Sequence, residues 1–507
     1  MEQTNSIIST YRKNVESVQT NVSTTLNTEN NIAKLLCTKA SSTIDNFEAI
    51  LGELKFNGTV CFSATYVNEN GEFFSISSSE NFSGKLEDSN ITPTTTALIN
   101  SNVIELKVDS SSNEIRLNAT VENNISLILS DNFNYYVNDN EEIVTNSNII
   151  NYSTLVSNGK LNFNYDESFE TKDNVQKVLN ISATSKILDY SLGTDYFTVE
   201  GIIFVNSLYE VLNDENRELR QFTNCYKFKE ELEVEGLTKE GYLLLNSSIN
   251  NCNITTNLEN KDNINVISFT IPVDVNYAYI LPTTSEVVVD AYSLKNKLNL
   301  NVESFKVDGI NNFKTFDEKI DGQTIISEDA PRIMKCVSYC GENVSITNSF
   351  KDNDNLVIEG IASVNVIYLE EDDNERLNSL IIEVPFSIEN RFDDLHDGDE
   401  ISTSAIIKDV DVKCKKGKEI NVELDLCFVV NSFNSLEEMA LTNVTLAEEL
   451  TPKEACLQIY FARKGNTLWD ISKGLTARPE EILNQNPNIN LPLEKDEKIV
   501  LFKGIDR

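Results

Sequence analysis

One strand pattern occurs three times along the chain and constrains the fold more than any other feature. The segments are FNGTVCFSATYV (56–67), VEGIIFVNSLYE (199–210) and IEGIASVNVIYL (358–369). Each has a glycine in third place and a tyrosine eight residues later, giving the pairs Gly58 and Tyr66, Gly201 and Tyr209, and Gly360 and Tyr368. Even spacing puts both residues, and those at every second place between them, on one face of a strand. The pattern therefore predicts three strands that each bury one face.

The similarity continues on both sides of each strand, which indicates a repeated unit. Lys34 precedes Gly58 by 24 residues, and Lys177 precedes Gly201 by the same number. A polar, acidic turn follows each tyrosine, and then come a second apolar strand, a long excursion and a further strand. Short alternating strands with Asn, Asp and Gly turns are typical of β-sandwiches. We expect a mainly β fold with three sandwich-like or open-barrel-like units, at residues 31–150, 170–295 and 325–445.

The glycine and tyrosine of each repeat are expected to be structural. A glycine within a strand marks a bulge or a close approach of another backbone. The tyrosine ring is expected to pack inside, with its hydroxyl at a rim. Between the units, segments rich in Asn and Ser around 137–148 and 308–322 suggest linkers. Residues 1–30 are polar, and we expect them to be weakly helical or disordered.

Acidic residues are in large excess, with 80 Asp and Glu against 42 Lys and Arg and a formal net charge of −38. Nucleic acids and anionic membranes would repel such a surface, so neither is an expected partner. The sequence shows no apolar leader at its start and no run of about 18 apolar residues. We therefore expect a cytoplasmic protein without a transmembrane segment.

Cysteine and histidine usage gives little basis for catalysis or metal binding. The nine cysteines are scattered and odd in number, so we expect mostly buried thiols in a reducing compartment. Cys336 and Cys340 are the one close pair, and with His396 as the single histidine a zinc site is not expected. His396 lies in an acidic stretch, and we find no nucleophile elbow, HExxH or phosphate loop. We expect no catalytic residue, no metal and no cofactor.

The composition changes at the C-terminal end, where a separate α+β domain is predicted over 457–503. From Leu457 to Arg507 there are eight Lys or Arg and seven Asp or Glu, so this part is about +1 and the rest about −39. A strand is expected at 457–462 and another at 498–502. Between them, Asn466 or Thr467 can cap a first helix, and Pro479 suits the first turn of a second helix over 479–486.

This end of the chain resembles the LysM family. The matching residues are Tyr460, Lys464, Gly465, Asn466, Thr467, Leu468, Trp469, Ile471, Ile482, Leu483, Asn486, Pro487 and Phe502. The resemblance implies a strand–helix–helix–strand domain that binds chitin or peptidoglycan through N-acetylglucosamine units. Family members often have Asp where this chain has Asn466. The implied contact residues, in two loops, are Lys464, Gly465, Asn466, Thr467, Leu468, Asn486, Pro487, Asn488 and Ile489.

Trp469 is the only tryptophan in the chain. We expect its ring to fill the core of this small domain rather than to stack on a sugar. Its loss would then unfold the domain. The expected core residues are Tyr460, Trp469, Ile471, Ile482 and Leu483.

Acidic β-repeats followed by a LysM-like end resemble the spore-coat morphogenetic proteins of endospore-forming Firmicutes, of the SipL and SpoVID type, over about residues 30–503. The resemblance implies a non-enzymatic scaffold or adaptor of spore coat assembly in the mother cell. It also implies docking at the forespore surface, where the LysM-like domain binds the coat basement-layer ATPase SpoIVA, with other coat proteins as further partners.

A different function class is also compatible with the sequence. The chain could be a peptidoglycan-binding protein of the cell wall or cortex, with or without an associated wall hydrolase, because LysM domains often accompany such enzymes. The absence of a recognisable leader and of a catalytic motif disfavours this alternative. Binding to peptidoglycan fragments, compared with binding to SpoIVA, would separate the two.

Overall fold

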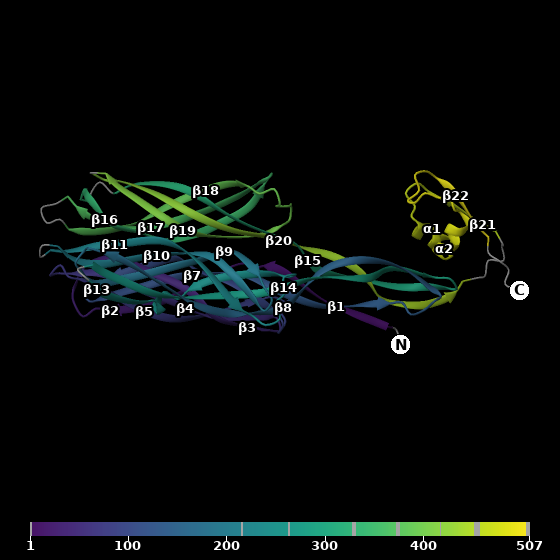
Figure 1. The fold of residues 1–507 in the computed structure, drawn as a ribbon, viewed down its shortest axis with the longest axis horizontal. Helices are drawn as coiled ribbons and strands as arrows, with labels where there is room; N and C mark the ends of the chain where they lie inside the picture. The colour runs from purple at the N-terminus through teal and green to yellow at the C-terminus, as the bar shows by residue number, and fades with distance from the viewer. Residues whose placement is uncertain are drawn as a thin grey trace.

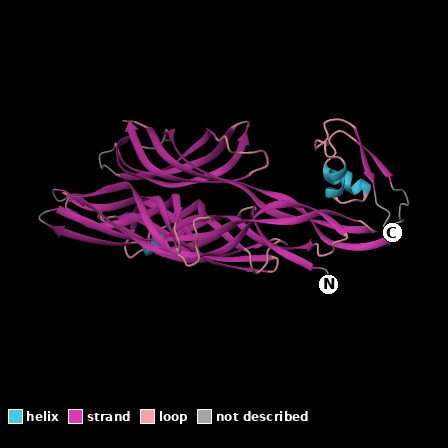
Figure 2. Cartoon of the chain, turned by 45° about the vertical axis from the view of Figure 1, so that its right-hand side comes forward, coloured by secondary structure: helices cyan, strands magenta, loops and turns pink. Residues whose placement is uncertain are grey.

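The computed structural model describes residues 3–213, 216–261, 264–326, 331–371, 376–415, 417–450 and 457–502. The chain is mainly β, as predicted, and the two α-helices among these residues both lie in a small α+β unit near the C-terminal end (Figures 1 and 2). The strands form several separate sheets.

The three predicted repeats appear as three sheets of the same design. Each has three antiparallel strands, and the central strand carries the glycine–tyrosine pattern. The sheets are β3 (Ile32–Ile50), β4 (Glu53–Asn68) and β5 (Phe73–Glu87); β9 (Val175–Leu192), β10 (Tyr196–Asn213) and β11 (Asn216–Glu233); and β16 (Ile333–Asp352), β17 (Asn355–Glu370) and β18 (Leu377–Arg391). The repeat read from the sequence is therefore a structural repeat.

A second layer covers the buried face of each repeat sheet and completes a sandwich. One eight-stranded sheet supplies this layer for the first two units, and a three-stranded sheet supplies it for the third. The central strand of the layer is β7 (Glu114–Val137), β14 (Ile264–Ser293) or β20 (Glu419–Glu449). In each unit the apolar residues of the two central strands share one core, as Phe62 of β4 does with Leu117 of β7. The flanking strands are β2 (Val18–Asn27) and β6 (Thr96–Ser110); β8 (Ile143–Thr171), β12 (Tyr242–Ile249) and β13 (Thr255–Lys261); and β15 (Asn296–Ile325) and β19 (Glu400–Lys415).

The first strand of each covering layer lies in a segment that the sequence suggested was irregular. Residues 1–30, expected to be weakly helical or disordered, form β1 (Gln3–Asn14) and β2. The linker suggested around 137–148 runs from the end of β7 into β8, and the linker at 308–322 lies inside β15. These expectations were wrong because the strands pair with segments about a hundred residues away, such as β1 with β7 and β15 with β20.

Beyond the sandwiches, β1 and the outer parts of five long strands form a stalk, seen on the right in Figure 1. The five strands are β7, β8, β14, β15 and β20. Phe133 and Phe305 stack in the stalk core with ring centroids 4.3 Å apart. At its base, Arg12 of β1 forms a buried ion pair with Asp308 of β15 at 3.2 Å, and the Tyr242 hydroxyl donates to the same carboxylate at 2.6 Å. The ion pair therefore holds β1 against β15, and Tyr242 supports it from β12.

The repeat glycines occupy close backbone approaches, as the sequence predicted. Gly58, Gly201 and Gly360 each lie at or beside a register shift against the preceding strand. On the other side each faces a phenylalanine of the following strand, the partners being Phe82, Phe228 and Phe386. A Cβ atom at any of these glycines would collide with that ring and with a backbone carbonyl. Only a residue without a side chain fits there.

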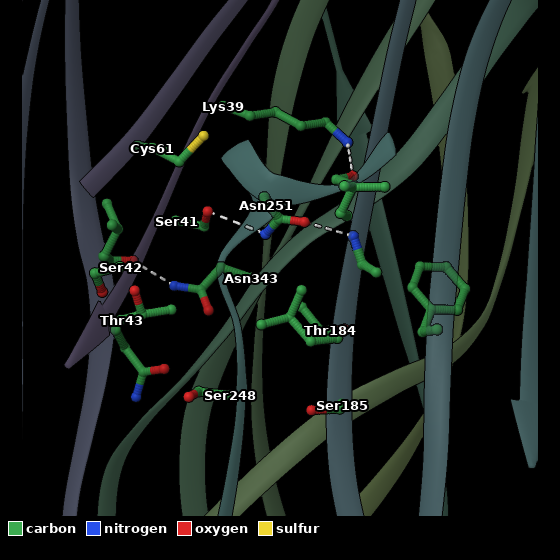
Figure 3. A pocket seen from close by; sticks show the side chains of 18 of the residues that line it. Lys39, Ser41, Ser42, Thr43, Cys61, Thr184, Ser185, Ser248, Asn251 and Asn343 are labelled. Carbon is green, nitrogen blue, oxygen red and sulfur yellow. Dashed lines mark hydrogen bonds between the residues drawn. The ribbon is translucent and has the colours of Figure 1, made fainter. Parts of the chain in front are cut away.

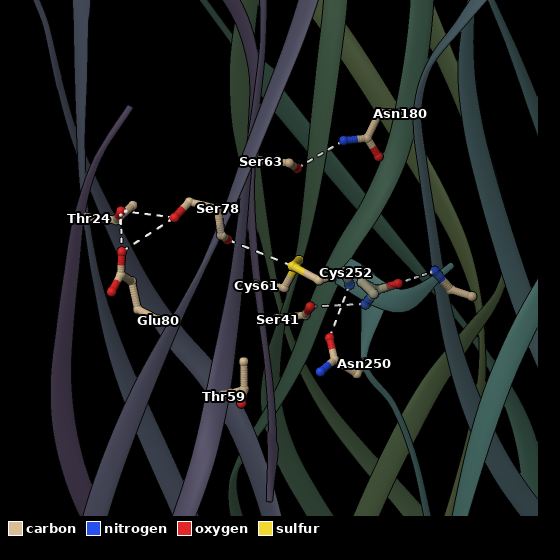
Figure 4. The surroundings of a disulfide bond; sticks show 12 residues. Thr24, Ser41, Thr59, Cys61, Ser63, Ser78, Glu80, Asn180, Asn250 and Cys252 are labelled. Carbon is tan, nitrogen blue, oxygen red and sulfur yellow. Dashed lines mark hydrogen bonds between the residues drawn. A yellow bond between two sulfur atoms is a disulfide. The ribbon is translucent and has the colours of Figure 1, made fainter. Parts of the chain in front are cut away.

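Cysteine pairing differs from the expectation of mostly free thiols. Cys61 of β4 is bonded to Cys252, which lies in a short 3-10 helix at Asn251–Asn253, so the bond joins the first unit to the second (Figure 4). Cys336 is bonded to Cys414 of β19 within the third unit, and not to its sequence neighbour Cys340. The partners lie 191 and 78 residues apart in sequence, a separation that no local spacing rule detects.

Candidate functional site

The C-terminal unit begins with β21 (Leu457–Ala462) and the helix α1 (Leu468–Leu475). Thr467 caps the helix, because its hydroxyl accepts from the Asp470 backbone N–H while the Asp470 carboxylate accepts from the Thr467 N–H. The backbone N–H groups of Thr467 and Asp470, which have no acceptor within the helix, are thus both hydrogen-bonded. Of the two predicted caps, Thr467 is the one used. The Asn466 side chain instead accepts from the Arg463 N–H at 2.7 Å.

The second helix, α2 (Pro479–Gln485), starts at the predicted proline. Asn486 follows it and ties it to β22 (Glu497–Phe502): its amide donates to the carbonyls of Ile482 and Val500, both at 2.9 Å, and accepts from the Val500 N–H at 3.2 Å. Asn486, predicted as a contact residue, therefore has its side chain occupied within the unit.

The first predicted contact loop is bonded to Leu493, a few residues beyond the second predicted loop. The Gly465 N–H donates to the Leu493 carbonyl at 2.7 Å, and the Leu493 N–H donates to the Asn466 carbonyl at 3.0 Å. Gly465 has a φ of +88°, a conformation that favours glycine. Leu468 and Ile489 pack against the core of the unit. The exposed contact candidates, which we call the loop ridge, are Lys464, Gly465, Thr467, Pro487 and Asn488.

The core of the unit only partly follows the prediction. Ile471 and Ile482 are fully buried, and Tyr460 packs against them. Leu483 is 40% exposed, so its assignment to the core was wrong. Trp469 is half-buried and lies outside the core cluster, so that assignment was wrong too. The cluster consists of Ala462, Ile471, Leu475, Ala477, Ile482, Leu493, Ile499 and Leu501.

Trp469 instead anchors the unit to the stalk. Its indole N–H donates to the Asp290 carboxylate of β14 at 2.8 Å, and its ring lies 5.1 Å from the ring of Tyr292. Lys473 donates to both oxygens of Asp290, at 2.8 and 2.7 Å. Burial alone would raise the pKa of Asp290, but the bonds from Lys473 and Trp469 outweigh it and hold that pKa below its ordinary value.

Two further bonds complete this docking contact. The Tyr292 hydroxyl donates to the Ala477 carbonyl at 2.6 Å, and Arg478 donates to the Glu141 carbonyl at 2.7 Å. Burial is the main cause that raises the pKa of Tyr292 to about 12, so its hydroxyl stays a donor at neutral pH. Sequence reasoning missed Asp290 and Tyr292, because nothing near them in sequence links them to a helix almost 180 residues away.

One face of the β21–β22 hairpin is largely apolar and partly exposed, and it also carries Lys498, whose ammonium lies 5.5 Å from the centroid of the Phe461 ring. Its apolar residues, which we call the hairpin face, are Leu457, Ile459, Phe461, Val500 and Phe502. The exposed fractions reach 70% for Phe461 and 62% for Phe502. The register pairs Leu457 with Phe502 and Ile459 with Val500 across the two strands, so these side chains adjoin. Contiguous apolar patches of this kind mark interaction surfaces.

The described residues offer no obvious reactive centre. His396 is exposed in its turn, with Nδ1 3.8 Å from the Asp399 carboxylate, as expected for a loop residue. No group of three or more His, Cys, Asp or Glu side chains within the described ranges is placed to hold a metal ion. No helix among these residues is both long enough and apolar enough to cross a membrane.

Comparison with known families concerns the β-sandwich body. Residues 174–262 and 332–415 match the family model described as SipL, SPOCS domain. They run from β9 to β13 in the second unit and from β16 to β19 in the third. Two regions of the chain, one in the second unit and one in the third, therefore match a SPOCS domain. These two units are SipL-like, in agreement with the resemblance seen in the sequence, while the C-terminal unit lies outside the matched residues. No curated protein and no solved structure matches the chain.

Proposed function

We propose that this chain is a non-enzymatic scaffold or adaptor of spore coat assembly. In this proposal it lies in the mother-cell cytoplasm at the forespore surface and binds the basement-layer ATPase SpoIVA through its C-terminal unit. The two SPOCS-domain matches support the assignment to the coat. The sandwiches supply a large scaffold, and the C-terminal unit is the part whose exposed surface is best suited to docking.

The observation that carries this proposal is the hairpin face. Phe461 and Phe502 are large aromatic side chains left in water, and burying each against a partner would contribute about 1.5–3 kcal/mol. Phenylalanine is enriched at protein–protein interfaces relative to the rest of the protein surface. The unit is also close to neutral while the rest of the chain is about −39, so a partner bound here does not meet the full acidic charge.

The loop ridge favours a second candidate function, the binding of peptidoglycan through N-acetylglucosamine. The ridge is polar and exposed, and it lies where the resemblance to LysM places the glycan contacts. The hairpin face and the loop ridge share no residue, so variants can test them separately.

The experiment measures binding of the full chain to purified SpoIVA and its sedimentation with insoluble peptidoglycan. Ile459→Thr with Phe461→Ser removes much of the hairpin face, and Lys464→Ala with Asn488→Ala alters the loop ridge. We expect the hairpin-face variant to bind SpoIVA at least tenfold more weakly, a loss of about 1.4 kcal/mol. The matched control is Phe313→Ser, at a phenylalanine of β15 that is 43% exposed, and it should bind normally.

Two results would contradict the proposal. One is that the unaltered chain fails to bind SpoIVA. The other is that the chain sediments with peptidoglycan and only the loop-ridge variant abolishes that sedimentation, which would establish the second candidate function instead. Fluorescence of Trp469 shows whether each variant keeps its C-terminal unit folded and docked.

A further inference from the structure

A polar chamber lies where the three repeat sheets meet (Figure 3). Strands β3, β9 and β16, one from each repeat sheet, all contribute to its wall. Its volume is about 420 Å³, within the usual range for small-molecule sites. The chamber is distant in sequence from the C-terminal unit, and the proposed scaffold function does not use it.

Hydroxyl and amide groups dominate the wall. Many are connected across unit boundaries: Asn180 donates to Ser63 at 2.9 Å, and Asn251 donates to Ser41 at 3.0 Å. Others that line the space in Figure 3 include Ser42, Thr184, Ser185, Ser248 and Asn343. Such groups both donate and accept hydrogen bonds, so they suit a ligand with several hydroxyl groups.

The charge of the wall is opposite to that of the chain. Lys39 and Lys186 line the chamber, whereas no Asp or Glu among the described residues does so. The chain as a whole has 80 acidic and 42 basic residues, so a wall whose described residues include two lysines and no carboxylate departs sharply from its composition. A positively charged wall of this kind favours an anionic ligand.

The two lysines differ in how their ammonium groups are satisfied. Lys39 donates to the Ser182 hydroxyl at 3.0 Å and to the Asn206 amide oxygen at 3.4 Å. Lys186 makes no hydrogen bond or ion pair with a residue that the structure describes, and burial lowers its pKa to about 8. A partly buried cation without a described counter-charge is destabilising, and a bound anion would relieve that cost.

Two neutral groups in the wall are also incompletely bonded. Thr43 and Asn206 are each at least nine-tenths buried. Within the described part of the chain, the Thr43 hydroxyl and the Asn206 amide nitrogen have no hydrogen-bond partner. Ordered water or the hydroxyl groups of a ligand can satisfy neutral groups like these.

We propose that the chamber binds a small polyhydroxylated oxyanion, such as a sugar phosphate or a sugar acid. The lysine ammonium groups pair with the phosphate or carboxylate, and the serine and asparagine side chains bind the hydroxyl groups. Because the wall comes from three units, the bound ligand would also hold the units together.

Calorimetric titration of the full chain tests this proposal, with D-glucose 6-phosphate and gluconate as the charged polyols and glucose and inorganic phosphate as the separate halves. We expect at least one charged polyol to bind ten or more times more tightly than either half. Lys39→Met and Lys186→Met should each weaken that binding about tenfold, and the control Lys227→Met, at an exposed position on β11, should not. Preference for the phosphate or for the carboxylate identifies the type of oxyanion.

Thermal unfolding without ligand separates a loss of binding from a loss of folding in the lysine variants. Without ligand, Lys186→Met should melt at a higher temperature than the unaltered chain, because it removes a partly buried charge without a described counter-charge. A lower melting temperature would make Lys186 a structural residue and overturn its assignment to the site. The proposal fails if neither charged polyol binds at about 10 mM, a concentration that detects even millimolar affinity, or if both lysine variants bind as the unaltered chain does.

Discussion

Gly58, Gly201 and Gly360 show how a single residue type fixes the same geometry three times. Each leaves room for a phenylalanine ring of the next strand beside a bulge in the preceding one. The sequence predicted the close approach, because glycine within an apolar strand is otherwise unfavourable. It did not identify the rings, although Phe82, Phe228 and Phe386 follow their glycines at similar intervals of 24, 27 and 26 residues.

Gly201→Ala should destabilise the second unit by about 1–3 kcal/mol, the usual cost of forcing extra volume into a packed site. The added methyl would collide with the Phe228 ring and the Lys186 carbonyl. Denaturant unfolding measures the effect. The control is Gly159→Ala on β8, where the nearest atom would lie 3.1 Å away on Tyr277. Equal stability of the two variants would show that the close approach at Gly201 relaxes freely.

At the scale of secondary-structure elements, neighbouring residues predicted where the helices begin, but the sequence did not predict which strands pair. The cap at Thr467 and the start of α2 at Pro479 follow from nearby residues, so the sequence predicted both helices. Four strands pair with segments far away in the sequence: β1, β2, β8 and β15. Because these strands contain many polar residues, the sequence suggested a disordered N-terminus and linkers instead. The orientation of Trp469 was likewise unpredictable, because its partners belong to β14.

The contact of α1 with the stalk should depend on pH through Asp290. Its pKa is lowered when the unit is docked, so the contact is at full strength above the ordinary value of 3.8 and is lost as the pH falls through the lowered value. Because Trp469 is the only tryptophan, its emission reports this contact directly. We expect a shift to longer wavelength with a midpoint below 3.8.

The Asp290→Ala variant should show the shifted emission already at neutral pH, while Glu286→Gln on the same strand should not. Unchanged emission in Asp290→Ala would mean that Asp290 does not hold the C-terminal unit in place.

At the scale of the whole molecule, the first two sandwiches are joined by more than chain connectivity. Strands β7, β1, β8 and β14 form one continuous sheet through the first two units, and the Cys61–Cys252 bond links the same units. Composition and cysteine number did not predict this bond. A reducing compartment would keep both groups as thiols, so the state of the bond also reports where the protein resides.

Under oxidising conditions, Cys252→Ser should lower the free energy of unfolding by up to about 5 kcal/mol, because the bond closes a very long loop. Denaturant unfolding without and with a reducing agent measures this, and the difference should vanish when the bond is reduced. Cys225→Ser, at a cysteine outside both bonds, is the control and should change little. Identical unfolding of Cys252→Ser and the unaltered chain without reductant would show that the bond is absent.

Strands β14 and β15 each contain 30 residues and β20 contains 31, so each could extend for about 100 Å. They run from the sandwiches to the stalk tip, where the C-terminal unit is seated. Tension applied at that tip would act along the strands and load the ladder hydrogen bonds in shear. Many bonds between β14 and β8, and between β15 and β20, would then resist together instead of opening one by one. We therefore expect the stalk to be stiff and to resist tension applied along its length.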